Sequence, residues 1–276
     1  MTNKIFPENF IFGTAVASYQ VEGGIYNNDW TIWENKKNTV CAEPCGEACK
    51  HYEKVDDDID LLENLGIRAF RFSIEWSRVE PQQGKFNEDA VLHYVSKAQK
   101  LIDKKIEPII TFHHFTTPDW LSKEGSWLNP NIDEYFGSYV EYMMNKLPKK
   151  IKFYNTINEP GIFAFFGYFS TTKFPPGIAD ENKFITASEN IMKAHVTALK
   201  TIKGINPDAM VGMTHALQEW EDHDTNKLKE YLKYHLEDKF LKASKEDDFI
   251  GLQTYTIVRY PKSILLKLVN PLLLNI

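Results

Sequence analysis

The chain has 276 residues, of which 43% are hydrophobic and 13% aromatic, enough for one large barrel or two smaller domains. Its formal net charge is −6, from 32 Lys and Arg residues against 38 Asp and Glu residues. This balance lacks the basic footprint of a nucleic-acid-binding protein, so we expect no nucleic-acid partner.

Short apolar runs alternate along the chain with longer stretches of helical spacing. The apolar runs predict six strands, over residues 10–15, 67–74, 106–112, 151–156, 209–214 and 249–255. The stretches between them predict helices, over residues 56–65, 87–102, 132–143, 184–203 and 228–236. Asn87 is expected to cap the second of these helices, and Gly66 and Gly204 are expected to follow the ends of the first and the fourth.

This alternation, with no linker between units, predicts a single α/β domain over residues 1–276, with a parallel sheet covered by helices. The polar residues that could do chemistry follow the strands, as in a (β/α)8 TIM barrel, whose sites gather at the carboxyl ends of the strands. A doubly wound sheet is the alternative, but it usually shows a glycine-rich phosphate turn, and none is present. Six strands of eight predict an incomplete barrel with two open sheet edges, through which the chain could self-associate.

The two ends of the sequence predict no targeting or membrane-spanning segment. Residues 1–7 have no apolar core of signal-peptide length, so we expect a cytoplasmic protein. Residues 263–276 are apolar, but they are shorter than the roughly 20 residues that span a bilayer, and Pro271 interrupts them. We expect this stretch to be covered by further protein; weak adhesion to a membrane surface is the alternative.

Cys41, Cys45 and Cys49 lie close together in the sequence, with His51 nearby. Such a cluster could hold zinc or an iron–sulfur centre. The spacing is not a standard ligand pattern. We therefore expect reduced thiols in a loop, and neither a metal nor an organic cofactor.

Glu159, between Asn158 and Pro160, follows the fourth predicted strand and opens a long aromatic loop. A carboxyl group at a strand end, beside a carboxamide and fixed by a proline, suits a proton donor to a sugar bond. That chemistry normally needs a second carboxylate facing the first. The alternative is a glutamate that only caps the loop. The aromatic residues of the loop either line an entrance or form its core: Phe163, Phe165, Phe166, Tyr168 and Phe169.

A series of motifs, in order between residues 7 and 256, resembles family 1 of the glycoside hydrolases. This family comprises retaining β-glucosidases, β-galactosidases and relatives that include phospho-β-glycosidases. The motifs are FGTAVASYQVEG (12–23), ACKHY (48–52), FRFSIEWSR (70–78), TFHHFTTP (111–118), GSWLN (125–129) and TINEP (156–160). The Gln20 signature and His114 separate the chain from cellulase-type barrels, which also carry Asn-Glu-Pro after strand four.

The resemblance implies a β-glucosidase-type hydrolase of O-glycosidic bonds that acts by retaining double displacement, with Glu159 as the general acid/base. It implies that Asn158 binds the 2-hydroxyl of the sugar, and that Gln20 and His114 bind its outer hydroxyls. Without the resemblance, Gln20 would be interpreted as a barrel-floor residue and His114 as a core histidine.

The resemblance also implies that Arg71 and Tyr255 lie against the nucleophilic carboxylate. The family carries this nucleophile on strand seven in a Thr-Glu-Asn-Gly motif, which these 276 residues lack. Glu219 is the nearest substitute by order. The chain also has Phe115 where the family usually has Trp, and Gln253-Thr254-Tyr255 where it has Asn-Tyr-Tyr.

We therefore expect a C-terminally truncated glycosidase domain that is weakly active or inactive alone. The alternatives are a catalytically dead relative that binds carbohydrate or protein, and an incomplete gene product. Reading the nucleotides downstream of Ile276 for Thr-Glu-Asn-Gly would test the last of these.

Overall fold

A six-stranded parallel sheet forms the centre of the computed structural model, which describes residues 6–220, 227–255 and 257–258. Its strands, in spatial order, are β1 (Gly13–Ala15), β2 (Ala69–Ser73), β3 (Glu107–His113), β4 (Phe153–Asn158), β5 (Met210–Ala216) and β7 (Phe249–Gln253). Every neighbouring pair is parallel. All six predicted strands are confirmed, although β1 begins three residues later than predicted. A small second sheet, of β6 (Glu219–Trp220) and β8 (Ile257–Val258), was not predicted.

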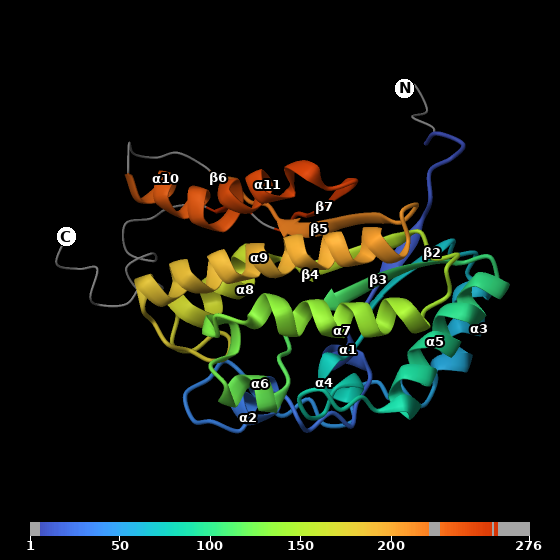
Figure 1. The fold of residues 1–276 in the computed structure, drawn as a ribbon, viewed down its shortest axis with the longest axis horizontal. Helices are drawn as coiled ribbons and strands as arrows, with labels where there is room; N and C mark the ends of the chain where they lie inside the picture. The colour runs from blue at the N-terminus through green and yellow to red at the C-terminus, as the bar shows by residue number, and fades with distance from the viewer. Residues whose placement is uncertain (1–5, 221–226, 256, 259–276) are drawn as a thin grey trace.

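Helices cover the outer face of the sheet (Figure 1). The long ones are α3 (Val55–Asn64), α5 (Glu88–Asp103), α7 (Ile132–Lys146) and α9 (Glu181–Ile205). After β6 come α10 (Lys227–Lys233), the π-helical turn η3 (Tyr234–Asp238), α11 (Lys239–Ala243) and the 3-10 turn η4 (Ser244–Glu246). Figure 1 shows α7 and α9 side by side across the sheet, and α3 beside α5 near one end.

Short helices connect the strands at one end of the sheet. They are α1 (Ser18–Val21), α2 (Asp29–Glu34), α4 (Trp76–Val79), α6 (Asp119–Lys123) and the 3-10 turn η1 (Ser126–Leu128). In Figure 1 the first four gather along the lower side of the molecule, below the sheet. None of them was predicted, because a helix of three to six residues is too short to show a period.

Two of the three helix ends that the sequence predicted from a capping residue or a glycine are correct. Asn87 caps α5, because its side-chain oxygen accepts hydrogen bonds from the N–H groups of Asp89 and Ala90, at 3.1 and 3.3 Å. Gly66, with φ 70°, follows α3 in the left-handed conformation that glycine adopts readily. The expectation for Gly204 is wrong: α9 runs through it to Ile205.

The sheet separates an apolar outer layer from a polar inner layer. Outward-facing strand residues are fully buried against the helices, among them Ile110, Phe112, Val211 and Met213. Inward-facing residues form hydrogen bonds across the strands, among them Arg71, Thr111, Asn155 and Thr214. The hydrophobic core therefore lies between sheet and helices, and the inner layer is free to carry chemistry.

The sheet curves as an incomplete (β/α)8 barrel, which confirms the expected fold. Strands β1 and β7 are the two edges of the six-stranded order. Between the inner residues of β1 to β4 lies an open cavity of about 410 Å³, lined by Ala15, Arg71, Ile109 and Phe153 among others. A single domain over residues 1–276 stays a prediction, because residues 259–276 lie outside the described part.

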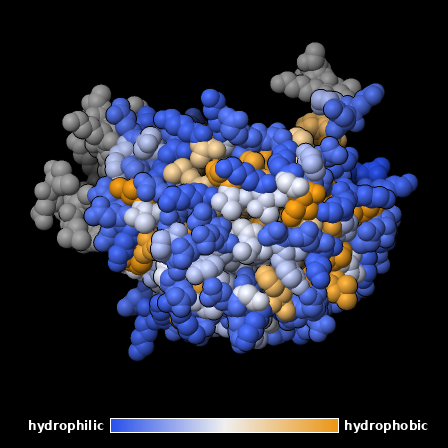
Figure 2. Space-filling view, viewed as in Figure 1, coloured by the Kyte–Doolittle hydropathy of each residue, from blue (hydrophilic) through white to orange (hydrophobic). Residues whose placement is uncertain are grey.

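The outer surface is largely hydrophilic on the face shown in Figure 2, where apolar side chains appear in small separate groups. Among the described residues, no helix is both long and apolar enough to cross a bilayer. The apolar stretch at 263–276 lies outside the described residues.

Candidate active site

Glu159 follows the last residue of β4 in a left-handed backbone conformation, with φ 45° and ψ 57°. Its N–H donates to the Thr214 carbonyl oxygen of β5 at 2.7 Å, and its own carbonyl accepts from Phe163 N–H at 2.9 Å. The pairing of β4 with β5 shifts register between Asn155 and Asn158. A non-glycine residue pays about 1–3 kcal/mol for such a conformation, and such strain clusters at functional sites.

The chain after Glu159 is helical, so the expected long loop is wrong. Pro160 occupies the first position of α8 (Pro160–Ala164), where its missing N–H costs nothing, and the π-helical turn η2 (Phe165–Phe169) follows directly. Of the aromatic residues, Phe163, Phe165, Tyr168 and Phe169 are at most 9% exposed and belong to the hydrophobic core. The open alternative is thereby decided for these four in favour of core packing.

Arg71, on β2, reaches across the inner face towards the end of β4. Its Nη2 donates to Asn158 Oδ1 at 2.6 Å and to Thr214 Oγ1 at 3.2 Å, and its Nε donates to Thr111 Oγ1 at 2.9 Å. Burial lowers the pKa of Arg71 to about 10, and the nearby Glu159 charge opposes that shift. The guanidinium is therefore a fixed positive charge at the site.

The Glu159 carboxyl group lies near this charge and near the Tyr255 hydroxyl. Burial raises the pKa of Glu159, while the Arg71 charge and the Tyr255 hydroxyl lower it. The net direction is upward, which suits a group that must hold a proton until the leaving oxygen takes it. Arg71 and Tyr255, expected beside a nucleophile, thus act on Glu159 in this chain.

Asn158 and Gln253 connect these groups. Asn158 Oδ1 accepts from Arg71, from Thr214 Oγ1 at 3.0 Å and from Gln253 Nε2 at 2.7 Å, while Asn158 Nδ2 has no partner among the described residues. Gln253 Oε1 accepts from the Tyr255 hydroxyl. With its amide turned by 180°, Gln253 would instead donate to Glu159 Oε1 at 2.6 Å. Gln253, noted in the sequence only as a departure, is therefore part of the site.

Gln20 and His114 line one cavity of about 160 Å³. Gln20 is exposed, whereas His114 is largely buried and its Nδ1 has no partner in the described structure. Burial and the Arg71 charge hold the pKa of His114 well below its usual range, so the ring is neutral. A carboxamide and a neutral imidazole each offer a donor and an acceptor, as sugar hydroxyls require.

Two aromatic residues that the sequence did not single out, Trp30 and Phe174, line the same cavity. Their ring centroids are 4.9 Å apart, and Trp30 Nε1 donates to the Phe115 carbonyl oxygen at 3.1 Å. No motif or spacing marked them, since they meet only through the fold. His113, by contrast, packs between the rings of Trp127 and Phe163, and burial lowers its pKa to about 3.

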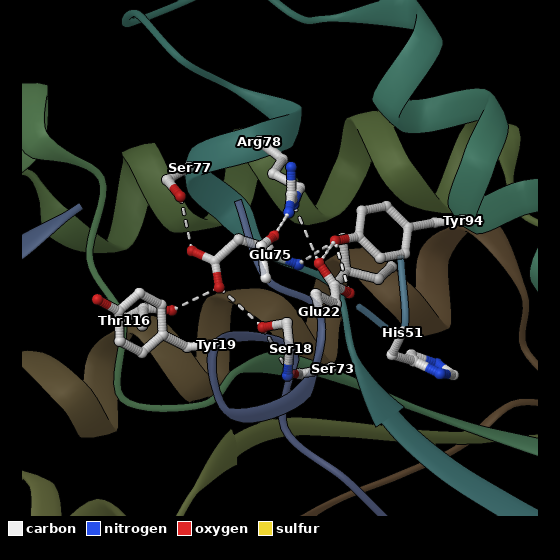
Figure 3. Close-up of polar contacts among 12 residues, drawn as sticks. Ser18, Tyr19, Glu22, His51, Ser73, Glu75, Ser77, Arg78, Tyr94 and Thr116 are labelled. Carbon is white, nitrogen blue, oxygen red and sulfur yellow. Dashed lines mark hydrogen bonds and ion pairs between the residues drawn. The ribbon is translucent and has the colours of Figure 1, made fainter. Parts of the chain in front are cut away.

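A buried polar network lies next to this cavity (Figure 3). Glu22, 2% exposed, accepts hydrogen bonds from the Tyr94 hydroxyl at 2.9 and 3.0 Å and from Arg78 Nε at 3.1 Å. Burial raises the pKa of Glu22 to about 7, against the charges of Lys97 and Arg78. Glu22 thus joins the chain segment of Gln20 to α4 and α5.

Glu219, the nearest substitute for the nucleophile by order in the sequence, lies on β6. It is exposed and is not among the hydrogen-bonding partners of Arg71.

The three cysteines are free thiols, and Cys45 Sγ donates to the Tyr19 carbonyl oxygen at 2.8 Å. Across the described ranges, no group of three or more His, Cys, Asp or Glu residues is arranged to hold a metal ion.

The chain is similar to known proteins in sequence and in structure. The family model described as glycosyl hydrolase family 1 matches residues 2–256. The chain is 34% identical over 221 residues to beta-glucosidase A of Acetivibrio thermocellus, which covers 77% of this chain and 49% of the relative. It is also 34% identical over 245 residues to a 6-phospho-beta-galactosidase of Staphylococcus epidermidis. This match covers 86% of this chain and 51% of the relative.

Solved structures show the same likeness. The beta-glycosidase from Pyrococcus horikoshii superposes with a TM-score of 0.85 at 33% identity, over 96% of this chain and 66% of the other. The beta-glucosidase from Thermotoga maritima in complex with deoxynojirimycin superposes with a TM-score of 0.83 at 25% identity, over 91% of this chain and 66% of the other. The chain thus spans about half the length of these curated relatives and about two thirds of these solved chains.

Proposed function

The chain belongs to glycosyl hydrolase family 1, and on that premise we propose that it carries the acid/base and sugar-binding half of a retaining β-glycosidase site. Glu159 is the general acid/base, Asn158 binds the sugar 2-hydroxyl, and Gln20 and His114 bind its outer hydroxyls. The observation that carries the proposal is the Glu159 carboxyl group, buried with a raised pKa beside Arg71.

In this proposal Glu159 would protonate the leaving oxygen as the glycosidic bond breaks and would then deprotonate the attacking water. Asn158 Nδ2, which has no partner in the described structure, is free to donate to a sugar hydroxyl. Retention requires a nucleophilic carboxylate about 5–5.5 Å from the acid/base. Among the carboxylates of the described residues, it is Glu159 whose charge raises the pKa of Arg71. We therefore expect very low turnover from this polypeptide alone.

A titration calorimeter tests the sugar-binding part independently of turnover. The protein should bind deoxynojirimycin saturably, and His114→Ala should weaken that binding by about tenfold or more, corresponding to one or two lost hydrogen bonds. Val196→Ala, on the exposed outer face of α9, is the matched control. No binding by the unaltered chain, or equal binding by the His114 variant, would contradict the proposed sugar site.

The sugar is proposed to be a β-glucoside, because of the similarity to beta-glucosidase A. A 6-phospho-β-galactoside is the second candidate, because the likeness to a 6-phospho-beta-galactosidase is equally strong and extends over more residues. Competition between glucose and galactose 6-phosphate for bound deoxynojirimycin separates the two. Catalytically dead carbohydrate binding remains the alternative function.

The open sheet edges are proposed to support self-association. On the edge strand β7, Ile250 is 47% exposed and Leu252 is 63% exposed. Unpaired, apolar edge strands are templates for pairing with another chain, and an edge lysine blocks that pairing. Sedimentation should show a mass that rises with concentration, and Leu252→Lys should shift the protein towards monomer. A monomer at every concentration would refute this proposal.

A further inference from the structure

Glu75 is a fully buried carboxylate between two sugar-site segments. It follows β2 and precedes the first residue of α4, and its exposed fraction is 0%. Its Oε2 accepts hydrogen bonds from Ser18 Oγ at 2.7 Å and from Thr116 Oγ1 at 3.0 Å, and its Oε1 accepts from Ser77 Oγ at 2.7 Å. Figure 3 shows the three hydroxyls converging on this one carboxyl group.

Two of these hydroxyls belong to the segments that line the cavity. Ser18 precedes Gln20 by two residues, and Thr116 follows His114 by two. Gln20, His114 and Thr116 all line the cavity of about 160 Å³. A single carboxylate oxygen therefore joins the segment after β1 to the segment after β3.

The hydroxyl directions are fixed by further contacts. Ser73 Oγ accepts from Ser18 N–H at 2.7 Å and donates to Ser18 Oγ at 2.9 Å, so the Ser18 hydroxyl proton points to Glu75. The Glu75 N–H donates to the Tyr94 oxygen at 3.2 Å. Both the backbone and the side chain of Glu75 are thus held in place.

The side chain of Glu75 is buried among hydroxyl groups. Within the described residues Glu75 forms no ion pair with Lys, Arg or His, and its carboxylate is compensated by hydroxyls alone. Hydrogen bonds to an ionised acceptor are stronger than those between neutral groups. The hydrogen bonds that its two oxygens accept from the hydroxyls thus explain why a carboxylate, and not an apolar side chain, occupies this buried position.

We propose that Glu75 is a positioning residue of the sugar site, which sets the spacing between Gln20 and His114 by clamping Ser18 and Thr116 on one oxygen. The assignment of that cavity to a sugar rests on the proposed function. The clamp itself rests only on the geometry of the three hydroxyls.

Hydrogen exchange of backbone amides tests the clamp without any ligand. Glu75→Ala should accelerate exchange in residues 17–20 and 114–117 together, by about tenfold or more. Glu75→Gln should restore protection, because its Oε1 takes the place of the shared oxygen and its Nε2 can donate to the Ser77 hydroxyl. Glu80→Ala is the matched control: Glu80 is also buried, but its carboxylate accepts from Trp76 Nε1 and Gly84 N–H. Unchanged protection in Glu75→Ala, or equal loosening by Glu80→Ala, would overturn the proposal.

Should Glu75→Ala fail to fold, Thr116→Val removes a single hydroxyl donor. It should loosen residues 114–117 and leave residues 17–20 protected. Unaltered exchange in both segments would count against the clamp.

Calorimetry with deoxynojirimycin adds the functional readout. Glu75→Ala should weaken binding about tenfold, and Glu75→Gln should stay within about threefold of the unaltered protein. Equal affinity for all three proteins would refute a positioning role. If the unaltered protein binds no deoxynojirimycin, the sugar assignment fails, and the exchange experiment still decides whether Glu75 clamps the two segments.

Discussion

The pH dependence of stability should carry a component from Glu22, which the variant Glu22→Gln removes. Burial raises the pKa of Glu22 from 4.5 to about 7. One pKa unit is worth about 1.4 kcal/mol, so the protonated form is favoured in the folded state by about 3 kcal/mol. The side chain is only 2% exposed, so solvent screening takes little from this figure.

The sign follows from proton binding. Between pH 4.5 and about 7 the folded state holds the Glu22 proton more tightly than the unfolded state does. The Glu22 contribution to the free energy of unfolding is therefore fully present below pH 4.5 and is lost as the pH rises to about 7. Lys97, whose pKa burial lowers to about 8, stays largely protonated across this window.

Urea unfolding followed by tryptophan fluorescence, at intervals from pH 4.5 to 7.5, measures the effect. Asp29, with a pKa raised to about 8 by burial, contributes to both proteins, so the difference between them isolates Glu22. The stability of the unaltered protein minus that of Glu22→Gln should fall by about 3 kcal/mol over the window. Tyr94→Phe, which removes a hydrogen bond that lowers the pKa of Glu22, should steepen the fall. A flat or rising difference would refute the reasoning.

Three further predictions concern the site and its support. Arg71→Met should raise the pKa of Glu159 further, because it removes the charge that lowers it; ¹³C NMR of the carboxyl carbon checks this, and a lower pKa would contradict it. Gly161→Ala should destabilise the fold by about 1–3 kcal/mol, since a Cβ would lie 1.9 Å from a carbonyl oxygen of η3. Its control, Gly204→Ala, meets nothing within 4 Å inside α9 and should stabilise the fold by about 0.5–1 kcal/mol; equal urea midpoints for the pair would refute both. Asp247→Ala should cost about 2–6 kcal/mol, because two buried donors, a histidine Nε2 at 2.8 Å and a strand N–H at 3.2 Å, lose their acceptor; a loss under 1 kcal/mol would contradict this.

Much of the fold could be predicted from the sequence because its signals are local. The six strands follow from short apolar runs, and Asn87 caps α5 through contacts with residues two and three positions ahead. The prediction that α9 ends before Gly204 was wrong because a glycine can continue a helix. The helix ends instead where the Asn206 N–H donates to the Ile202 carbonyl oxygen.

The site was harder to predict, since its contacts join distant parts of the chain. The left-handed turn at Glu159 depends on the carbonyl of Thr214, which lies on the next strand of the sheet. Trp30 and Phe174 meet beside the cavity across a separation that no spacing rule covers. The motifs located Glu159, but only the fold shows that Arg71 and Tyr255 act on it.

The most direct test of the central claim is the rate of p-nitrophenol release from p-nitrophenyl β-glucoside by the 276-residue chain and by its Glu159→Gln variant, side by side. If Glu159 is an acid/base without a nucleophile in this chain, the two rates will coincide near the rate without protein. Turnover of the unaltered chain at about 1–10³ s⁻¹, ordinary for enzymes, that Glu159→Gln abolishes would contradict the account.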